Sequence, residues 1–186
     1  MIHHLTPVDY RIQPWANGRG QTVELARDDD AQGVIWRLSV AAVSEEGPFS
    51  RFPGLQRNLT VIRGPGFTLR GAGITLRAAL LTPVAFPGEI DISADDVTGS
   101  SEDFNVMVRA ALPPPEVTIA IGALAAAGLL ALYAIETATV SGVVLHRSDL
   151  MLTDGAAHVT GGPVLAARIL GLSDPEKRLR QPGQQA

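Results

Sequence analysis

Short strand-like runs recur along almost the whole chain, and glycine and proline turns separate them. Runs of alternating polarity or of β-branched residues are typical of β-strands. In the first half, the predicted strands are residues 23–27, 34–43, 59–63, 66–70, 73–80 and 104–109. In the second half, they are residues 117–121, 129–137, 138–146, 149–153 and 164–170. Because this spacing leaves few places for a long helix, the sequence predicts an all-β meander, sandwich or barrel.

Composition excludes several classes of protein. Apolar residues make up 46% of the 186 residues, which is enough to bury a core. The chain has no cysteine, so a disulfide framework, a thiolate metal site and a cysteine nucleophile are excluded. The net charge is −4 and no basic run is present, which argues against nucleic acid or a membrane as a partner. The first residues do not resemble a secretory signal, so we expect a cytoplasmic protein.

One apolar stretch, residues 117–135, is nearly free of charge and is barely long enough to span a membrane. It is rich in alanine and glycine, and neither basic loops nor an aromatic belt flank it. Such a segment inserts poorly into a bilayer. We therefore expect it to be a buried part of the fold.

The organisation along the chain predicts two β-units. Three prolines at 113–115 form a stiff joint. A weak repeat relates residues 59–76 to residues 130–145. We therefore expect a first unit over residues 1–112 and a second, smaller unit over 113–172. The charged, glutamine-rich residues 173–186 are expected to form a disordered tail.

Polar residues gather in three motifs of the first half, set among aromatic residues and glycines. The motifs are WANGRGQTVE at 15–24, WRLS at 36–39 and GPFSRFPGLQR at 47–57. Together with FPG at 86–88 and DFNVM at 103–107, in this order, they resemble the HutD/Ves family. The chain departs from the family at Gly18-Arg19-Gly20, where three glycines are usual, so the shape of this loop is open.

This resemblance implies a cupin-like double-stranded β-helix, a jelly-roll barrel, duplicated as a bicupin. It also implies an association with histidine utilisation in bacteria. The role proposed for the family is non-catalytic: a member binds a small anionic intermediate such as N-formylglutamate or formate and so limits flux or induction.

Metal ligands are sparse. Cupin enzymes usually bind a metal through a His-x-His pair, a carboxylate and a later histidine. Here His3 and His4 are adjacent, so they point to opposite faces of an extended chain, and His146 and His158 stand alone. We therefore predict neither a metal nor any other cofactor.

Two arginines are the leading candidates for binding an anion. Arg57 follows a Pro-Gly turn and leads into an apolar strand, where an inward guanidinium could hold a carboxylate with two hydrogen bonds. The alternative is an exposed arginine at the strand end, and the family resemblance favours the inward one. Arg37 is the second candidate; its alternative role is a structural ion pair with Glu24 or Asp103.

Other candidates surround these arginines. Asp103 and Asn105 share one face of a predicted strand, which points either into a barrel or to solvent. Trp15, Trp36 and Phe49 could supply apolar walls, or could pack in the core. The predicted ligand-binding set is Arg57, Arg37, Trp15, Trp36, Glu24, Thr22, Ser39, Phe49, Asp103 and Asn105.

Three functions remain open at this point. The first is a non-catalytic protein that binds a small anionic metabolite; whether it forms a homodimer is open. The second is a metal-independent isomerase or hydrolase with Glu24 or Asp103 as general base and Arg57 as anchor. The third is a protein-interaction module with an exposed apolar surface in the second half. We expect the site in the first unit only, and a polar cavity around Tyr133, Thr137 and His146 would contradict this.

Overall fold

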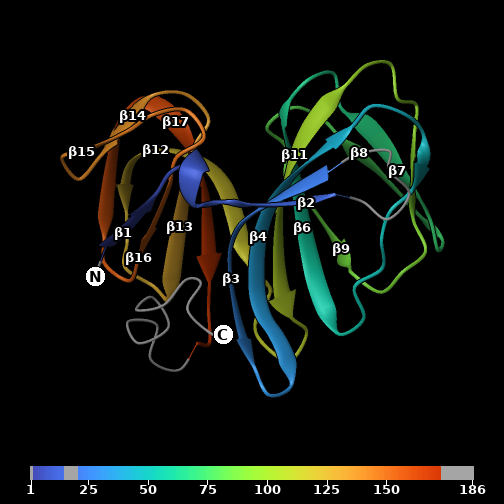
Figure 1. Ribbon diagram of the computed structural model, residues 1–186, viewed down its shortest axis with the longest axis horizontal. Helices are drawn as coiled ribbons and strands as arrows, with labels where there is room; N and C mark the ends of the chain where they lie inside the picture. Colours follow the sequence, from blue (N-terminus) through green and yellow to red (C-terminus); the bar gives the residue numbers. More distant parts are fainter. Residues whose placement is uncertain (1, 15–20, 173–186) are drawn as a thin grey trace. The chain divides into compact units, whose positions relative to one another are not determined.

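The computed structural model describes residues 2–14 and 21–172, and Figure 1 shows that they form β-strands joined by turns. Among these residues there is one short 3₁₀ helix, η1 (Pro7–Asp9), which begins at a proline whose fixed φ suits that position. No helix in this part of the chain is long and apolar enough to cross a membrane. The predicted all-β class is confirmed. The Gly18-Arg19-Gly20 loop and the expected tail lie outside the described residues.

The chain divides into two compact units. Unit 1 consists of the described parts of Met1–Tyr10, Leu25–Asp28 and Ala111–Ala186. Unit 2 consists of the described parts of Arg11–Glu24 and Asp29–Ala110. Unit 1 thus combines the first ten residues with the second half of the chain, and unit 2 contains most of the first half. That the two units are copies of one motif stays a prediction.

Unit 1 contains a seven-stranded antiparallel sheet. Its strands are β1 (Ile2–Leu5), β12 (Glu116–Leu124), β13 (Leu129–Ala134), β14 (Ala138–Val140), β15 (Val143–Leu145), β16 (Leu150–Thr153) and β17 (Ala157–Ile169). They lie in the order β1-β16-β13-β17-β14-β15, and β12 pairs with β17. Its apolar core cluster consists of Leu130, Leu132, Ala134, Ala138, Val140, Leu145, Met151, Ala157, Val159, Val164 and Ala166. The apolar stretch 117–135 therefore forms strands of this sheet.

The prediction of a single strand over residues 138–146 is wrong. This segment is a hairpin, in which β14 and β15 pair through Val140 and Val143 with Ser141 and Gly142 between them. Both turn residues have positive φ, 48° and 87°, which is the geometry of a two-residue hairpin turn. The Ser-Gly pair was the turn signal that the run of valines concealed.

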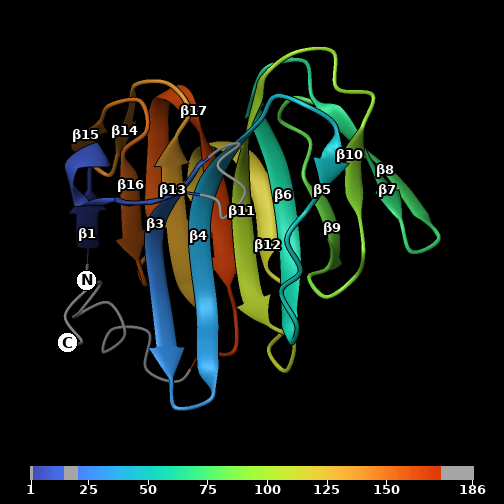
Figure 2. The same cartoon turned by 45° about the vertical axis from the view of Figure 1, so that its right-hand side comes forward.

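Unit 2 contains most of a six-stranded sheet and all of a four-stranded sheet. The six strands, in spatial order, are β2 (Arg11–Pro14), β3 (Gln21–Asp30), β4 (Gly33–Val43), β11 (Ser101–Arg109), β6 (Leu55–Arg63) and β9 (Val84–Pro87). The four are β5 (Gly47–Pro48), β10 (Ser93–Asp95), β7 (Phe67–Gly71) and β8 (Ile74–Ala78). Figure 2 shows β4, β11 and β6 side by side. Residues of both sheets, including Leu59, Val61, Phe67 and Leu69, share one apolar core.

Five short strands were not predicted: β1, β2, β5, β9 and β10. Three of them, β2, β5 and β9, end in a proline and lie at the edge of a sheet. Proline has no N–H to donate, so it is tolerated at edges and lowers the strand signal of the sequence. These strands form because a neighbouring strand pairs with them, which local composition does not reveal.

Candidate functional site

The register of three adjacent strands gathers the polar residues of unit 2. On β11, Met107 pairs with Arg37 of β4 on one side and with Arg57 of β6 on the other. Two residues along β11, Asn105 pairs with Ser39. Residues directly opposite each other, and residues two apart on one strand, share a face of the sheet. Both arginines, Ser39 and Asn105 therefore point to the same side, and the Cα atoms of the arginines are about 10 Å apart.

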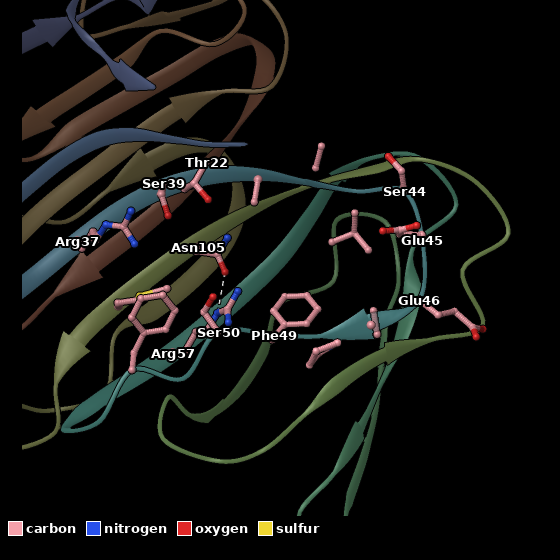
Figure 3. A pocket seen from close by; sticks show the side chains of 18 residues that line it. Thr22, Arg37, Ser39, Ser44, Glu45, Glu46, Phe49, Ser50, Arg57 and Asn105 are labelled. Atoms are coloured by element: carbon pink, nitrogen blue, oxygen red, sulfur yellow. Dashed lines mark hydrogen bonds between the residues drawn. The ribbon is translucent and has the colours of Figure 1, made fainter. Parts of the chain in front are cut away.

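A cavity of about 750 Å³ opens on this side of the sheet in unit 2. A volume of this size accommodates a small metabolite. Six of the predicted residues line it, namely Thr22, Arg37, Ser39, Phe49, Arg57 and Asn105. In Figure 3, Arg37 and Arg57 lie at one end of the cavity, and Ser44, Glu45 and Glu46 lie at the other end. The cavity is therefore cationic at one end.

Arg57 is 5% exposed, and three phenyl rings surround its guanidinium group. The guanidinium carbon lies 4.7 Å from the ring centroid of Phe49, 5.4 Å from that of Phe86 and 5.8 Å from that of Phe52. Rings at these distances attract a cation and restrict its position. The alternative of an exposed strand-end arginine is therefore wrong, because the side chain is nearly buried and the strand begins before the arginine, at Leu55.

One hydrogen bond holds the guanidinium group of Arg57 in position. Its Nε donates to Oδ1 of Asn105 at 2.8 Å, drawn as a dashed line in Figure 3. Among the described residues, its two terminal amino groups have no hydrogen-bond acceptor. Burial lowers the pKa of Arg57 to about 10, with a further decrease from Arg37 and an opposing increase from Asp103. The side chain is therefore still a cation at neutral pH.

Asn105 links Arg57 to a buried carboxylate. Its Nδ2 donates to Oδ2 of Asp103 at 2.6 Å. Asp103 is fully buried and does not line the cavity. Burial raises the pKa of Asp103 to about 6, although Arg57 and the Asn105 hydrogen bond both lower it. Of the two orientations left open by the sequence, the strand therefore turns Asp103 and Asn105 inward.

Arg37 forms the structural ion pair that the sequence offered as one alternative. Its Nε donates to Oε2 of Glu24 at 2.7 Å, and its Nη2 donates to Oε1 of Gln13 at 3.0 Å. Arg37 and Glu24 are both nearly buried, at 8% and 4% exposure. The guanidinium also lies 5.9 Å from the ring centroid of Phe52. Arg37 lines the cavity as well, so the ion pair does not exclude a contact with a ligand.

The predicted tryptophans do not both reach the cavity. Trp36 is 1% exposed and does not line it. Trp36 precedes Arg37 on β4, and adjacent strand residues point to opposite faces, so only one of the two can face the cavity. Trp36 therefore packs in the interior, the other role considered for it. Trp15 lies outside the described residues.

Sequence reasoning missed several residues of the site, among them Gln13 and Met107. Gln13 holds Arg37 but lies on β2, which the sequence did not predict. Met107 lines the cavity between the two arginines and was quoted only as part of a motif. The alternation Asp103, Asn105, Met107 was the available signal, because residues two apart share a face. The described residues also contain no group of three or more histidines and carboxylates that could hold a metal ion.

The fold and the cavity together define a class: an all-β, cupin-like protein with room for a small molecule in one unit. Bacterial pirin YhhW from Escherichia coli shares this architecture, with a TM-score of 0.62 and 10% identity over 91% of this chain and 99% of that chain. An identity this low shows the fold alone.

The family follows from closer matches. The HutD family model matches residues 8–162, so the chain belongs to the HutD family. The structure of HutD from Pseudomonas fluorescens SBW25 is 32% identical and has a TM-score of 0.81, covering 92% of this chain and 100% of that chain. An uncharacterised 21.2 kDa protein in the hutC 3′ region of Pseudomonas putida is 41% identical over 102 residues. Protein Ves of Escherichia fergusonii is 36% identical over 107 residues.

The curated relatives are matched over part of their length. The matched segment spans 54% of the Pseudomonas putida protein and 56% of protein Ves. The corresponding shares of this chain are 53% and 54%. The chain thus spans about half the length of the curated relatives it matches.

Proposed function

We propose that this protein binds a small carboxylate-bearing metabolite in the cavity of unit 2, without turning it over, as part of histidine utilisation. The observation that carries this proposal is Arg57. It is a nearly buried cation whose Nε is held by Asn105, and its terminal amino groups have no acceptor among the described residues. A planar carboxylate can accept two parallel hydrogen bonds from such a guanidinium.

The surroundings of Arg57 favour binding because they fix the cation before a ligand arrives. The rings of Phe49, Phe52 and Phe86 restrict the side chain, so little rotamer entropy is lost on binding. A cavity of about 750 Å³ is large enough for N-formylglutamate as well as for formate. Arg37, Ser39 and Thr22 line the same cavity and offer further polar contacts.

The family supports the biological setting of the proposal. One relative is a protein of the hutC 3′ region, and the structure of HutD from Pseudomonas fluorescens was obtained in a formate condition. These facts concern those proteins, and they guide the choice of ligands to test here. A cytoplasmic location and a homodimer stay predictions.

The alternative of a metal-independent enzyme has one observation in its favour, the pKa of Asp103 near 6, which suits a general base. However, Asp103 does not line the cavity, so it has no direct path to a proton on a ligand. Glu24 is held by Arg37 at 2.7 Å. We therefore propose binding in preference to catalysis.

Calorimetric titration with N-formylglutamate, glutamate, urocanate and formate tests this proposal. We expect saturable binding of at least one of them, weakened about 30-fold or more in Arg57→Met, because charge-assisted hydrogen bonds contribute roughly 1.5–3 kcal/mol each. Arg63→Met is the matched control, since Arg63 lies on the same strand with a largely exposed side chain. Its affinity should equal that of the wild type.

Two further measurements separate a loss of binding from a loss of folding, and binding from catalysis. Thermal unfolding shows whether Arg57→Met is folded, and Arg57→Lys, which keeps the charge but not the paired N–H groups, should bind with intermediate affinity. Analysis of the titrated mixtures for products tests the enzyme alternative. Binding that is equal in wild type and folded Arg57→Met would contradict the proposal, and so would formation of a product.

A further inference from the structure

A fully buried carboxylate in unit 2 has one oxygen without a partner. Oδ2 of Asp103 accepts the hydrogen bond of Asn105, but Oδ1 has no hydrogen-bond partner among the described residues. A buried carboxylate oxygen without a donor is costly when the group is ionised. Burial costs less when this oxygen carries a proton, because the carboxyl group is then neutral. The geometry therefore provides a place for one proton at Oδ1.

Asn105 couples this carboxylate to the proposed anion site. Its Nδ2 lies 2.6 Å from Asp103 and its Oδ1 lies 2.8 Å from Nε of Arg57. A flipped amide would bring an NH₂ group against the donor of Arg57, so the amide has one orientation. Asp103 thus lies two hydrogen bonds away from the cation that would hold the ligand.

The charges around Asp103 can be counted strand by strand. Directly opposite Asp103 lie Ala41 of β4 and Val61 of β6, which carry no charge. The charged residues on this side of the sheet are Arg37 of β4 and Arg57 of β6, and Glu24 of β3 offsets Arg37. The side chains that the four-stranded sheet contributes to the core here are apolar, and the acids that line the cavity wall are Glu45 and Glu46. Arg57 is therefore the one cation near Asp103 that no carboxylate contacts directly in the described residues.

A ligand carboxylate at Arg57 would place a second negative charge beside this single cation. Two carboxylates that share one buried cation repel each other, and a proton on one of them removes the repulsion. The carboxylate of Asp103 is the one that can take the proton, because it is fully buried while a ligand in the cavity keeps its contacts with Arg57.

We propose, resting on the function proposed above, that a carboxylate binds at Arg57 together with one proton, which Asp103 takes from solvent at Oδ1. The anion keeps its charge, Asp103 becomes neutral, and the site gains no net charge. Asp103 then makes the affinity for a carboxylate depend on pH. In the free protein the pKa of Asp103 lies near 6, so at pH 7 the group is mostly ionised and able to take up a proton.

Calorimetry in buffers with different ionisation enthalpies measures this proton directly. The probe is formate, titrated at pH 7 in HEPES and in Tris. We expect wild type to take up roughly half a proton or more per bound formate, and the affinity to fall up to about tenfold per pH unit between pH 6 and 8. Asp103→Asn should take up none and bind with an affinity independent of pH.

The matched control is Glu102→Gln, which removes a partly exposed carboxylate from the neighbouring position of β11 and should keep the wild-type proton uptake. Should Asp103→Asn fail to fold, carbon-13 NMR of the Asp103 carboxyl group in wild type decides, because saturating formate should raise its pKa. Formate binding without proton uptake would overturn this inference and leave the proposed function intact. No binding of any of the probes to wild type would overturn both.

Discussion

Both units of this protein are built from β-sheets, but their interiors differ. Unit 1 has a core cluster of aliphatic side chains and one methionine. In unit 2, one face of the central strands carries Arg37, Arg57, Asp103 and Asn105 next to its apolar core, and a cavity remains there. Each of these polar groups has a partner at 2.6–2.8 Å. In unit 2 an open cavity therefore occurs where buried polar side chains hold one another in place.

Unit 1 also contains close polar contacts, but they hold strand ends. Nε2 of His4 on β1 lies 2.9 Å from Oδ2 of Asp149, which directly precedes β16. The hydroxyl of Tyr10 donates to the carbonyl of Ser148 at 2.6 Å. These contacts fasten the first residues of the chain to the turn before β16. The polar groups of unit 2 are instead in the middle of strands.

The largest effect should come from breaking the buried ion pair of unit 2. Arg37→Met removes the guanidinium group that contacts the Glu24 carboxylate, which is 4% exposed. Removing one partner of a buried pair costs about 3–5 kcal/mol. We expect a loss of this size in the free energy of unfolding measured with urea.

The double variant Arg37→Met with Glu24→Gln separates the ion pair from simple packing. It also removes the buried charge of Glu24, so it should recover a large part of the loss in the free energy of unfolding. A double variant as unstable as the single variant would mean that the charge of Glu24 is not the cause.

The next effect concerns the filled core of unit 1. Leu132 is fully buried, and Leu132→Ala should lower the free energy of unfolding by about 2–5 kcal/mol, since it leaves a void among close-packed neighbours. Ser39→Ala, at the cavity of unit 2, should change it by less than about 1 kcal/mol. If both variants lost the same free energy of unfolding in urea, the proposed difference between the filled interior of unit 1 and the open interior of unit 2 would be wrong.

Asp103 should make the stability of the protein depend on pH. Its folded-state pKa, near 6, lies above the ordinary value of 3.8, so the folded state binds the proton more tightly than the unfolded state. The stability from this group is present below about pH 4 and is lost as pH rises through 6, by on the order of 2–3 kcal/mol. Asp103→Asn should remove this loss, so that it is more stable than wild type at pH 8 but not at pH 4. Parallel pH profiles of the two proteins would contradict the assignment.

The smallest effect should come from a strand-end contact of unit 1. Tyr10→Phe removes the hydrogen bond to Ser148 and keeps the ring. A typical net loss is about 0.5–1.5 kcal/mol, visible as a small shift of the thermal midpoint. A loss as large as that of Arg37→Met would mean that unit 1, like unit 2, depends on its polar contacts.

Local pattern predicted the long strands well, because alternation and β-branched residues act within each segment. The strands over 34–43 and 104–109 match β4 and most of β11. The edge strands escaped prediction because pairing with a neighbour forms them, as for β2 and β9. The hairpin at Ser141-Gly142 escaped because valines on both sides of the Ser-Gly pair resemble one continuous strand.

Many residues of the site could be predicted from the sequence, but their arrangement in space could not. Arg57 and Arg37 stood out because charge inside an apolar run requires a partner. Their common face depends on the pairing of both strands with β11, which no local pattern contains. The same register decides that Arg37, and not Trp36, faces the cavity. The role of Gln13 depends on a strand that was not predicted at all.

A crystal structure of the protein with N-formylglutamate, or with formate at high concentration, would show whether Arg57 holds a carboxylate. We expect a carboxylate within hydrogen-bond distance of both terminal amino groups of Arg57, inside the cavity of unit 2. A ligand bound elsewhere, with the guanidinium of Arg57 untouched, would contradict it.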